Sequence, residues 1–123
     1  MNTIISAPEA LAAMADGKLI LVDIRTPPEW MQTGIAKGAR LLNMQHPQGA
    51  EGFVAELLQI MGGDKNAPVA LICRTGARTR QVQQYLQQME KFTQVLDVNE
   101  GMAGSPSGPG WLRRGLPVET YIP

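Results

Sequence analysis

Cys73, the only cysteine of the 123-residue chain, precedes a short run of residues suited to nucleophilic chemistry. Four apolar residues, 69–72, precede Cys73, and residues 74–79 after it read Arg-Thr-Gly-Ala-Arg-Thr. Gly76 allows a tight bend in which successive backbone N–H groups turn inward and bind an anion. A helix after the bend adds its positive N-terminal end. These features favour a thiolate over a thiol, and they predict a reactive cysteine in a loop that also binds an anionic substrate.

The charge distribution around Cys73 supports this interpretation. The chain has 11 basic and 11 acidic residues, yet no acidic residue lies between Asp64 and Glu90, where three arginines lie. Two plainer interpretations remain: a buried cysteine that only fills space, and arginines on a solvated helix face. We expect Cys73 at the mouth of a positively lined pocket. Burial among apolar side chains, away from solvent and from the guanidinium groups, would contradict that expectation.

The elements that must position this loop are short aliphatic runs alternating with helical segments. We expect strands at residues 19–24, 39–44, 68–72 and 94–98, and helices at residues 7–15, 27–34, 52–61 and 78–92. Ser6 with Glu9, and Thr26 with Glu29, have the spacing of helix-capping boxes. Alternating strands and helices predict a parallel sheet, which binds ligands beyond the carboxyl ends of its strands. Cys73 follows such a strand.

Two helices have a predicted inner face. For residues 52–61 we expect it to comprise Phe53, Leu57, Leu58 and Ile60. For residues 78–92 we expect Val82, Tyr85, Leu86 and Met89, at positions i, i+3, i+4 and i+7.

Residues 101–110, Gly-Met-Ala-Gly-Ser-Pro-Ser-Gly-Pro-Gly, form a loop that is long for a compact domain. It is either a flexible insertion without a role or a flap over a site. Trp30 and Trp111 are expected in the core. His46, the only histidine, is expected to be exposed in a loop, so a Cys–His hydrolase is not favoured.

Composition limits the remaining possibilities. The length fits one domain over residues 1–123, and the 44% apolar content fits a folded core. A net charge of zero argues against nucleic-acid binding, and no apolar stretch is long enough to span a membrane. The first 15 residues lack a basic region and contain Glu9, so we expect no secretory signal. A single cysteine excludes an internal disulfide and a multi-cysteine zinc site, and we expect no cofactor or metal. Without a disulfide, a reducing, cytoplasmic location is expected.

Three motifs occur in order along the chain. The first motif comprises Asp23-x-Arg25, Glu29-Trp30, Gly34 and Gly38-Ala39; the second is Cys73-Arg74-Thr75-Gly76-Ala77-Arg78-Thr79; the third comprises Gly101-Met102, Trp111 and Gly115-Leu116-Pro117-Val118. Together they resemble the rhodanese family of sulfurtransferases, in its single-domain form. In the first motif, the family commonly has a histidine between the first glycine and the Gly-Ala pair. Here residues 34–39 read Gly-Ile-Ala-Lys-Gly-Ala, so that histidine is absent. The spacing from Gly101 to Trp111 is also longer than usual.

The resemblance implies an α/β fold, rhodanese-like, with a central parallel sheet of about five strands flanked by helices on both faces. It implies an enzyme of the thiosulfate sulfurtransferase type, in which Cys73 takes a sulfane sulfur as a persulfide. It also implies transfer of that sulfur to cyanide, a thiol or a protein acceptor. Arg74, Arg78 and the loop residues Thr75, Gly76, Ala77 and Thr79 would bind the small anionic donor. Asp23 and Arg25 resemble positions that brace this loop.

Two other functions are considered. A phosphatase of the same fold needs a Cys-x5-Arg loop, and the sixth residue after Cys73 is Thr79, with arginines at positions 78 and 80. A non-catalytic persulfide carrier in a sulfur relay would keep Cys73 without efficient turnover of thiosulfate. An exposed hydrophobic patch near residues 101–110 would favour the carrier. No glycine spacing in the chain fits a nucleotide site.

Overall fold

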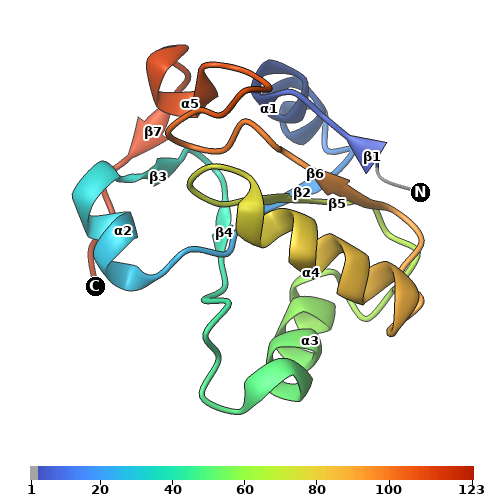
Figure 1. Cartoon of the computed structure of the whole chain (residues 1–123). Helices are drawn as coiled ribbons and strands as arrows, with labels where there is room; N and C mark the ends of the chain where they lie inside the picture. Colours follow the sequence, from blue (N-terminus) through green and yellow to red (C-terminus); the bar gives the residue numbers. More distant parts are fainter. Residues whose placement is uncertain (1–2) are drawn as a thin grey trace.

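A five-stranded parallel sheet with helices on both faces forms the centre of the computed structural model, which describes residues 3–123 (Figure 1). The strand order in the sheet is β1-β6-β5-β2-β4. Its strands are β1 Thr3–Ile4, β2 Ile20–Asp23, β4 Arg40–Leu41, β5 Val69–Ile72 and β6 Val95–Asp97. The helices are α1 Ala7–Ala15, α2 Pro27–Thr33, α3 Gly49–Ile60, α4 Ala77–Gln88 and α5 Gly110–Arg113. A separate antiparallel pair joins β3 Ile35–Ala36 to β7 Val118–Glu119.

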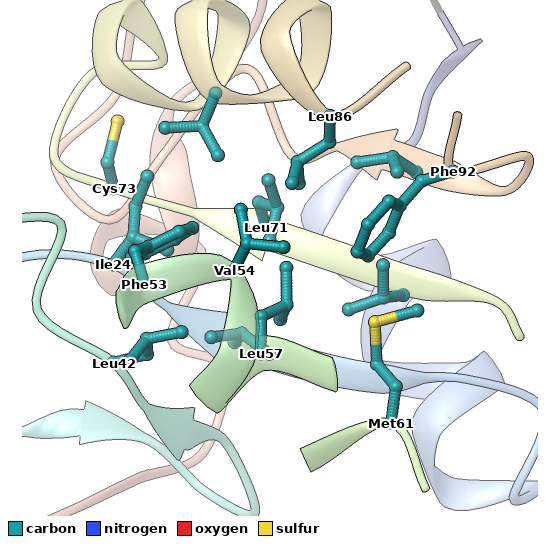
Figure 2. Packing of buried hydrophobic residues seen from close by; sticks show 14 residues of the cluster. Ile24, Leu42, Phe53, Val54, Leu57, Met61, Leu71, Cys73, Leu86 and Phe92 are labelled. Carbon is teal, nitrogen blue, oxygen red and sulfur yellow. The ribbon is translucent and has the colours of Figure 1, made fainter. Parts of the chain in front are cut away.

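Alternation along the central strands divides the core into two clusters, one on each face of the sheet. Under α3 and α4, β5 contributes Val69 and Leu71 to one cluster (Figure 2). On the opposite face, under α1 and α5, it contributes Ala70 and Ile72 to the other. β5 is therefore buried on both faces, as its continuous apolar sequence predicts. The expected fold class, with helices covering both faces of a parallel sheet, is confirmed.

The two predicted capping boxes fix the starts of α1 and α2. At α1, the N–H of Glu9 donates to the Ser6 hydroxyl, and the N–H of Ser6 donates to the Glu9 carboxylate. At α2, the N–H and the hydroxyl of Thr26 both donate to Oε1 of Glu29. Glu29 is thereby held at the amino end of α2.

Several predicted element boundaries are wrong. Strand residues 39–44 reduce to β4, whereas β1, β3, β7 and α5 were not predicted. α3 begins at Gly49 rather than at residue 52, and α4 ends at Gln88 rather than at residue 92. The missed strands have only two residues each, so their pairing depends on distant partners rather than on a local pattern.

The predicted inner face of α4 is correct only for Val82 and Leu86. Tyr85 is 38% exposed and Met89 is 68% exposed. The buried residues of α4 are Thr79, Val82, Gln83 and Leu86, so the inner face is rotated toward two polar side chains. For α3, Phe53 and Leu57 are buried as expected, together with Val54, whereas Leu58 and Ile60 are only partly buried.

Both tryptophans are buried, as expected, and the indole N–H of Trp111 donates to the carbonyl of Pro117. Of the helices in residues 3–123, none has the length and hydropathy needed to cross a bilayer. The predicted domain spans residues 1–123, of which Met1 and Asn2 lie outside the described residues.

Candidate active site

The Cys73 side chain lies one residue beyond the carboxyl end of β5 and faces α4 (Figure 2). Its Sγ accepts a hydrogen bond from the N–H of Gly76 at 3.2 Å and lies 3.7 Å from the Thr79 hydroxyl. On its other side Cys73 packs in the apolar cluster that includes Ile24, Phe53 and Val82. The sulfur thus lies between loop donors and the hydrophobic core.

The expected exposure of Cys73 is wrong. The residue is only 1% exposed, because it continues the inward alternation of Val69 and Leu71 beneath α4. Burial among apolar side chains and away from solvent was the condition that would contradict the expected site, and the structure meets both of these parts. The sulfur nevertheless keeps two polar neighbours, the Gly76 N–H and the Thr79 hydroxyl.

The bend after Cys73 has the predicted glycine geometry. Gly76 adopts φ 93°, and a Cβ at this position would fall against the carbonyl oxygen of Asn99. Only glycine satisfies both conditions, since a side chain would strain the left-handed backbone and strike the neighbouring loop. The bend directs the N–H of Gly76 onto Sγ, which is one element of the anion-binding loop expected from the sequence.

Arg78 does not point freely into the loop. Its Nη1 and Nη2 each lie 2.8 Å from a carboxylate oxygen of Glu29, which forms a bidentate ion pair between α4 and α2. The Arg78 hydrogen bonds lower the pKa of Glu29 from 4.5 to about 2, although burial opposes the shift. Arg78 therefore has a structural role, the ion pair with Glu29, which competes with its expected donor-binding role. The sequence hypothesis assigned no such partner to Arg78.

Asp23 and Arg25 form the strand-end ion pair that the resemblance implied as a brace. Both side chains are buried, and the Arg25 guanidinium donates to both Asp23 carboxylate oxygens. Arg25 also donates to the Thr33 hydroxyl and to the carbonyl of Gly34 at the end of α2. This pair fixes α2, which in turn holds Arg78 through Glu29.

Arg74 is the exposed arginine of the loop. Among the ion pairs of residues 3–123 none includes Arg74, and its side chain lines a cavity of about 390 Å³. Arg25, Glu29 and Met102 line the same cavity. Thr75 and Ala77 are exposed as well, whereas Gly76 and Thr79 are buried. Of the two predicted donor-binding arginines, Arg74 has the available charge.

A second cavity, of about 430 Å³, opens between α3 and α4. Its lining is mostly apolar and includes Met44, Phe53 and Val82, the last two of which also pack with Cys73. His46 lines this cavity too. Its side chain is only 12% exposed, so the expectation of an exposed loop histidine is wrong. Its Nδ1 accepts from the N–H of Gln48, and its Nε2 lies 3.1 Å from Glu56. Both ring nitrogens are therefore occupied.

Residues 101–110 contact the backbone of the cysteine loop. The N–H groups of Met102 and Ala103 donate to the carbonyls of Cys73 and Arg74. A Cβ on Gly101 would strike the Arg74 backbone, so glycine is needed for this close approach. Ser105 and Gly108 exchange backbone hydrogen bonds farther along. Backbone hydrogen bonds thus hold the segment both at the cysteine loop and at its own tip. It is therefore not a flexible insertion, which was one of the two interpretations of the sequence.

Glu100 anchors the far end of this segment. Its buried carboxylate accepts from the N–H groups of Ala7 and Gly110 and from Nε of Arg114. Burial alone would raise the pKa of Glu100, but these donors outweigh it and hold the pKa below its usual value. Glu100 was not predicted as a structural residue, although an acidic side chain next to a glycine-rich turn is a recognisable signal.

The fold and the site together define a parallel α/β domain with a cysteine-centred loop at the carboxyl edge of its sheet. Within residues 3–123, no three His, Cys, Asp or Glu side chains are grouped so that they could hold a metal ion. A family model described as the rhodanese-like domain matches residues 6–105. The chain belongs to the rhodanese-like domain family.

Several solved structures are similar to this chain. The polysulfide-sulfur transferase homodimer from Wolinella succinogenes has a TM-score of 0.70 and 23% identity, covering 98% of this chain and 80% of that one. A rhodanese-like domain protein from Staphylococcus aureus has a TM-score of 0.65 and 21% identity, covering 99% of this chain and 100% of that one.

The thiosulfate sulfurtransferase from Pseudomonas aeruginosa has a TM-score of 0.73 and 18% identity, covering 97% of this chain but only 20% of that one. A search of curated proteins gave no match. At these identities the three structures establish the fold alone.

Proposed function

We propose that this protein is a sulfurtransferase in which Cys73 carries a sulfane sulfur as a persulfide. The observation that most directly supports this proposal is the Gly76 N–H, which donates to Sγ at the carboxyl edge of the sheet. The same amide would stabilise a thiolate and then a persulfide. Family membership and the names of the two similar transferases support the same reaction class.

The reaction with an anionic sulfane donor such as thiosulfate needs no general acid or base. The Cys73 thiolate attacks the outer sulfur, a new S–S bond forms, and the original S–S bond breaks. Sulfite leaves with the bonding electron pair, so the three negative charges of the reactants reappear on the persulfide and on sulfite. An acceptor thiolate or cyanide then attacks the outer sulfur of the persulfide and regenerates the Cys73 thiolate.

Of the two arginines expected to bind the donor, Arg74 is the available one, because its side chain is exposed and belongs to none of the ion pairs of residues 3–123. The buried position of Cys73 adds a requirement. Since the thiol is 1% exposed, the loop or the side chains over it must shift before a donor reaches the sulfur. Sulfur transfer is therefore expected to include an opening step.

Mass spectrometry of the intact protein after exposure to thiosulfate tests the proposal. We expect a gain of one sulfur atom on the wild-type protein and none on Cys73→Ser, which keeps the size of the side chain. Circular dichroism of the variant is the control for folding. A wild-type protein that gains no sulfur, or a Cys73→Ser variant that retains more than about a tenth of the transfer rate, would contradict the role of Cys73.

The burial of Cys73 also favours a second candidate, a persulfide carrier that delivers sulfur to one protein partner. A sulfur held away from solvent is protected until a partner opens the site. Steady-state turnover of thiosulfate with cyanide separates the two candidates. A protein that gains sulfur but turns over at a rate close to that of a free thiol is a carrier.

A further inference from the structure

A third cavity, of about 460 Å³, opens beside β6 at the carboxyl edge of the sheet. Its walls are formed by the cysteine loop, the end of β6, one side of α4 and residues 105–107. Ligands of parallel α/β sheets bind beyond the carboxyl ends of the strands, and cavities of about 300–1,000 Å³ are typical of small-molecule sites. By position and size this cavity is a candidate binding site, and the sulfur chemistry described above does not use it.

Asp97, the last residue of β6, lines this cavity and is 4% exposed. Its Oδ1 has no hydrogen-bond partner among residues 3–123, and the Thr79 hydroxyl nearby donates to the carbonyl of Gly76. Burial raises the pKa of the Asp97 carboxyl, and the Thr79 hydroxyl and the charge of Arg80 offset only part of the rise. A buried carboxylate that lacks donors destabilises a fold, so its position in a cavity wall points to a donor supplied by a ligand.

Arg80, in the first turn of α4, lines the same cavity with an exposed side chain. None of the ion pairs in the described part of the chain includes Arg80 or Asp97, so two opposite charges line one cavity without bonding to each other. Two other polar side chains of the wall are already engaged. The Gln83 amide donates to two backbone carbonyls, and the Asn99 amide donates to the Ser107 hydroxyl. The available charges of the cavity are therefore one carboxylate and one guanidinium.

These two charges restrict the chemistry of a ligand. A simple cation is attracted by Asp97 but repelled by Arg80, and a simple anion meets the reverse. A zwitterion satisfies both groups, because its ammonium group donates to the carboxylate while its own carboxylate accepts from the guanidinium. Ile4, which is 57% exposed, and Pro106 add an apolar part to the wall. A ligand with a zwitterionic head and an apolar side chain therefore matches the whole lining.

We propose that this cavity binds a small zwitterion of the α-amino-acid class, held between Asp97 and Arg80 with its apolar side chain against Ile4. Ammonium and carboxylate groups on one carbon atom supply the donor and the acceptor that the two walls lack. The occupant would also contact residues 75–77 of the cysteine loop, which form part of the wall. The proposal concerns binding alone, and it goes beyond the sulfur transfer proposed above.

NMR titration of the isotope-labelled protein with L-leucine tests the proposal, because backbone amide shifts report both affinity and location. We expect saturable shifts at Ala77, Arg80 and Asn99, with a dissociation constant of about 1 mM or tighter. Two fragments of leucine are matched probes: isopentylamine lacks the carboxylate, and isocaproate lacks the ammonium group. Each should bind at least about tenfold more weakly than leucine, because each leaves one charged wall without its partner.

Substitutions in the two charged walls test the assignment of residues. Arg80→Gln removes an exposed charge that no ion pair of residues 3–123 uses, so the variant should fold normally and bind leucine at least about tenfold more weakly. Arg80→Lys keeps the charge and should recover part of the affinity. Asp97→Asn, which is equal in size, should also weaken leucine binding. Arg113→Gln, which removes an exposed arginine of α5 outside the cavity, should bind as the wild type does.

Three results would overturn the proposal. The first is the absence of saturable shifts up to about 20 mM leucine, which is the result expected if the Arg80 side chain closes directly onto Asp97. The second is equal binding of leucine and its two fragments, which would mean that the paired charges do not select the ligand. The third is an unchanged affinity in Arg80→Gln, a variant whose folding does not depend on a buried contact. The titration uses no sulfur donor, so a failure of sulfur transfer at Cys73 would leave its result standing.

Discussion

Glu29 and Arg78, 49 positions apart in the sequence, form a bidentate ion pair with two N–O distances of 2.8 Å. The pair joins the amino end of α2 to the first turn of α4. Because Arg25 fixes the other end of α2 through Thr33 and Gly34, the cysteine loop is connected to the end of β2 by a chain of charged contacts. The first sequence motif, which contains Arg25 and Glu29, is therefore in direct contact with the second, which contains Arg78.

Replacing Glu29 by Gln should destabilise the protein by roughly 2 kcal/mol at neutral pH. The folded-state pKa of Glu29, about 2, is below its ordinary value of 4.5, so its contribution is present above pH 4.5 and is lost as the pH falls through 2. Urea unfolding at neutral pH and near pH 2 measures this: the difference between Glu29→Gln and the wild type should disappear in acid.

Glu51→Gln is the control for the loss of one exposed carboxylate from the first turn of a helix, and it should change the unfolding free energy by less than about 0.5 kcal/mol. If Glu29→Gln were no more destabilising than Glu51→Gln at neutral pH, the ion pair would not contribute to stability.

Arg74→Ala should weaken the use of thiosulfate more selectively than Arg78→Ala. Arg74 is exposed, and no ion pair of residues 3–123 engages it, so its removal is expected to raise the apparent KM for thiosulfate about five- to tenfold with little loss of stability. Arg78→Ala breaks the pair with Glu29 and should lower the unfolding free energy as well.

Steady-state kinetics and urea unfolding on the same variants separate these effects. Arg74→Lys keeps the charge and should recover part of the affinity, and Arg113→Ala removes an exposed arginine from α5 as a control for net charge. An unchanged KM for Arg74→Ala would exclude this side chain from donor binding.

The sequence predicts the elements whose signals are local. The Ser6 and Thr26 capping boxes mark the starts of two helices, and the apolar run before Cys73 identifies a strand buried on both faces. β1 and β7 could not be predicted in this way, because two residues are too short for a periodic pattern and pair only with strands far along the chain.

The position of the candidate site at the end of β5 could be predicted from the sequence, but the burial of the Cys73 side chain was not predicted. The loop motif identified Cys73 and the glycine bend, yet the same alternation that buries Val69 and Leu71 also places Cys73 beneath α4. That signal was present in the sequence and was outweighed by the surrounding arginines. The pairing of Arg78 with Glu29 had no local signal, because it depends on how α2 and α4 meet in three dimensions.

Val82→Ala should open a route to the buried thiol. Val82 lines the cavity between α3 and α4 and packs in the cluster with Cys73, so removing two methyl groups thins the layer between cavity and sulfur. We expect alkylation of Cys73 by iodoacetamide under native conditions to become about fivefold faster or more, with a loss of roughly 1–3 kcal/mol in stability.

Leu86→Ala is the matched control, because Leu86 is buried in the same cluster and helix but does not line the cavity. It should destabilise the protein at least as much while accelerating alkylation less. Equal acceleration by both variants would show that global unfolding, rather than local opening from the cavity, exposes Cys73.

Gly76→Ala should damage both the fold and the sulfur site. At φ 93° a Cβ is strained by about 1–2 kcal/mol, and here it would also meet the carbonyl oxygen of Asn99, so the loop must move. Movement of the loop displaces the N–H that donates to Sγ. We expect a loss of about 2–4 kcal/mol in stability and at least a tenfold slower gain of sulfur from thiosulfate.

Gly17→Ala separates backbone strain from the clash. Gly17 has φ 69° after α1, but no atom lies within 4 Å of the position that an alanine methyl group would take, so this variant should lose only about 1 kcal/mol and transfer sulfur at the wild-type rate. Urea unfolding and the time course of persulfide formation by mass spectrometry measure the two effects. A Gly76→Ala protein that gains sulfur as fast as Gly17→Ala would mean that the Gly76 amide does not stabilise the reacting sulfur, and the loop amide would lose its place in the proposed mechanism.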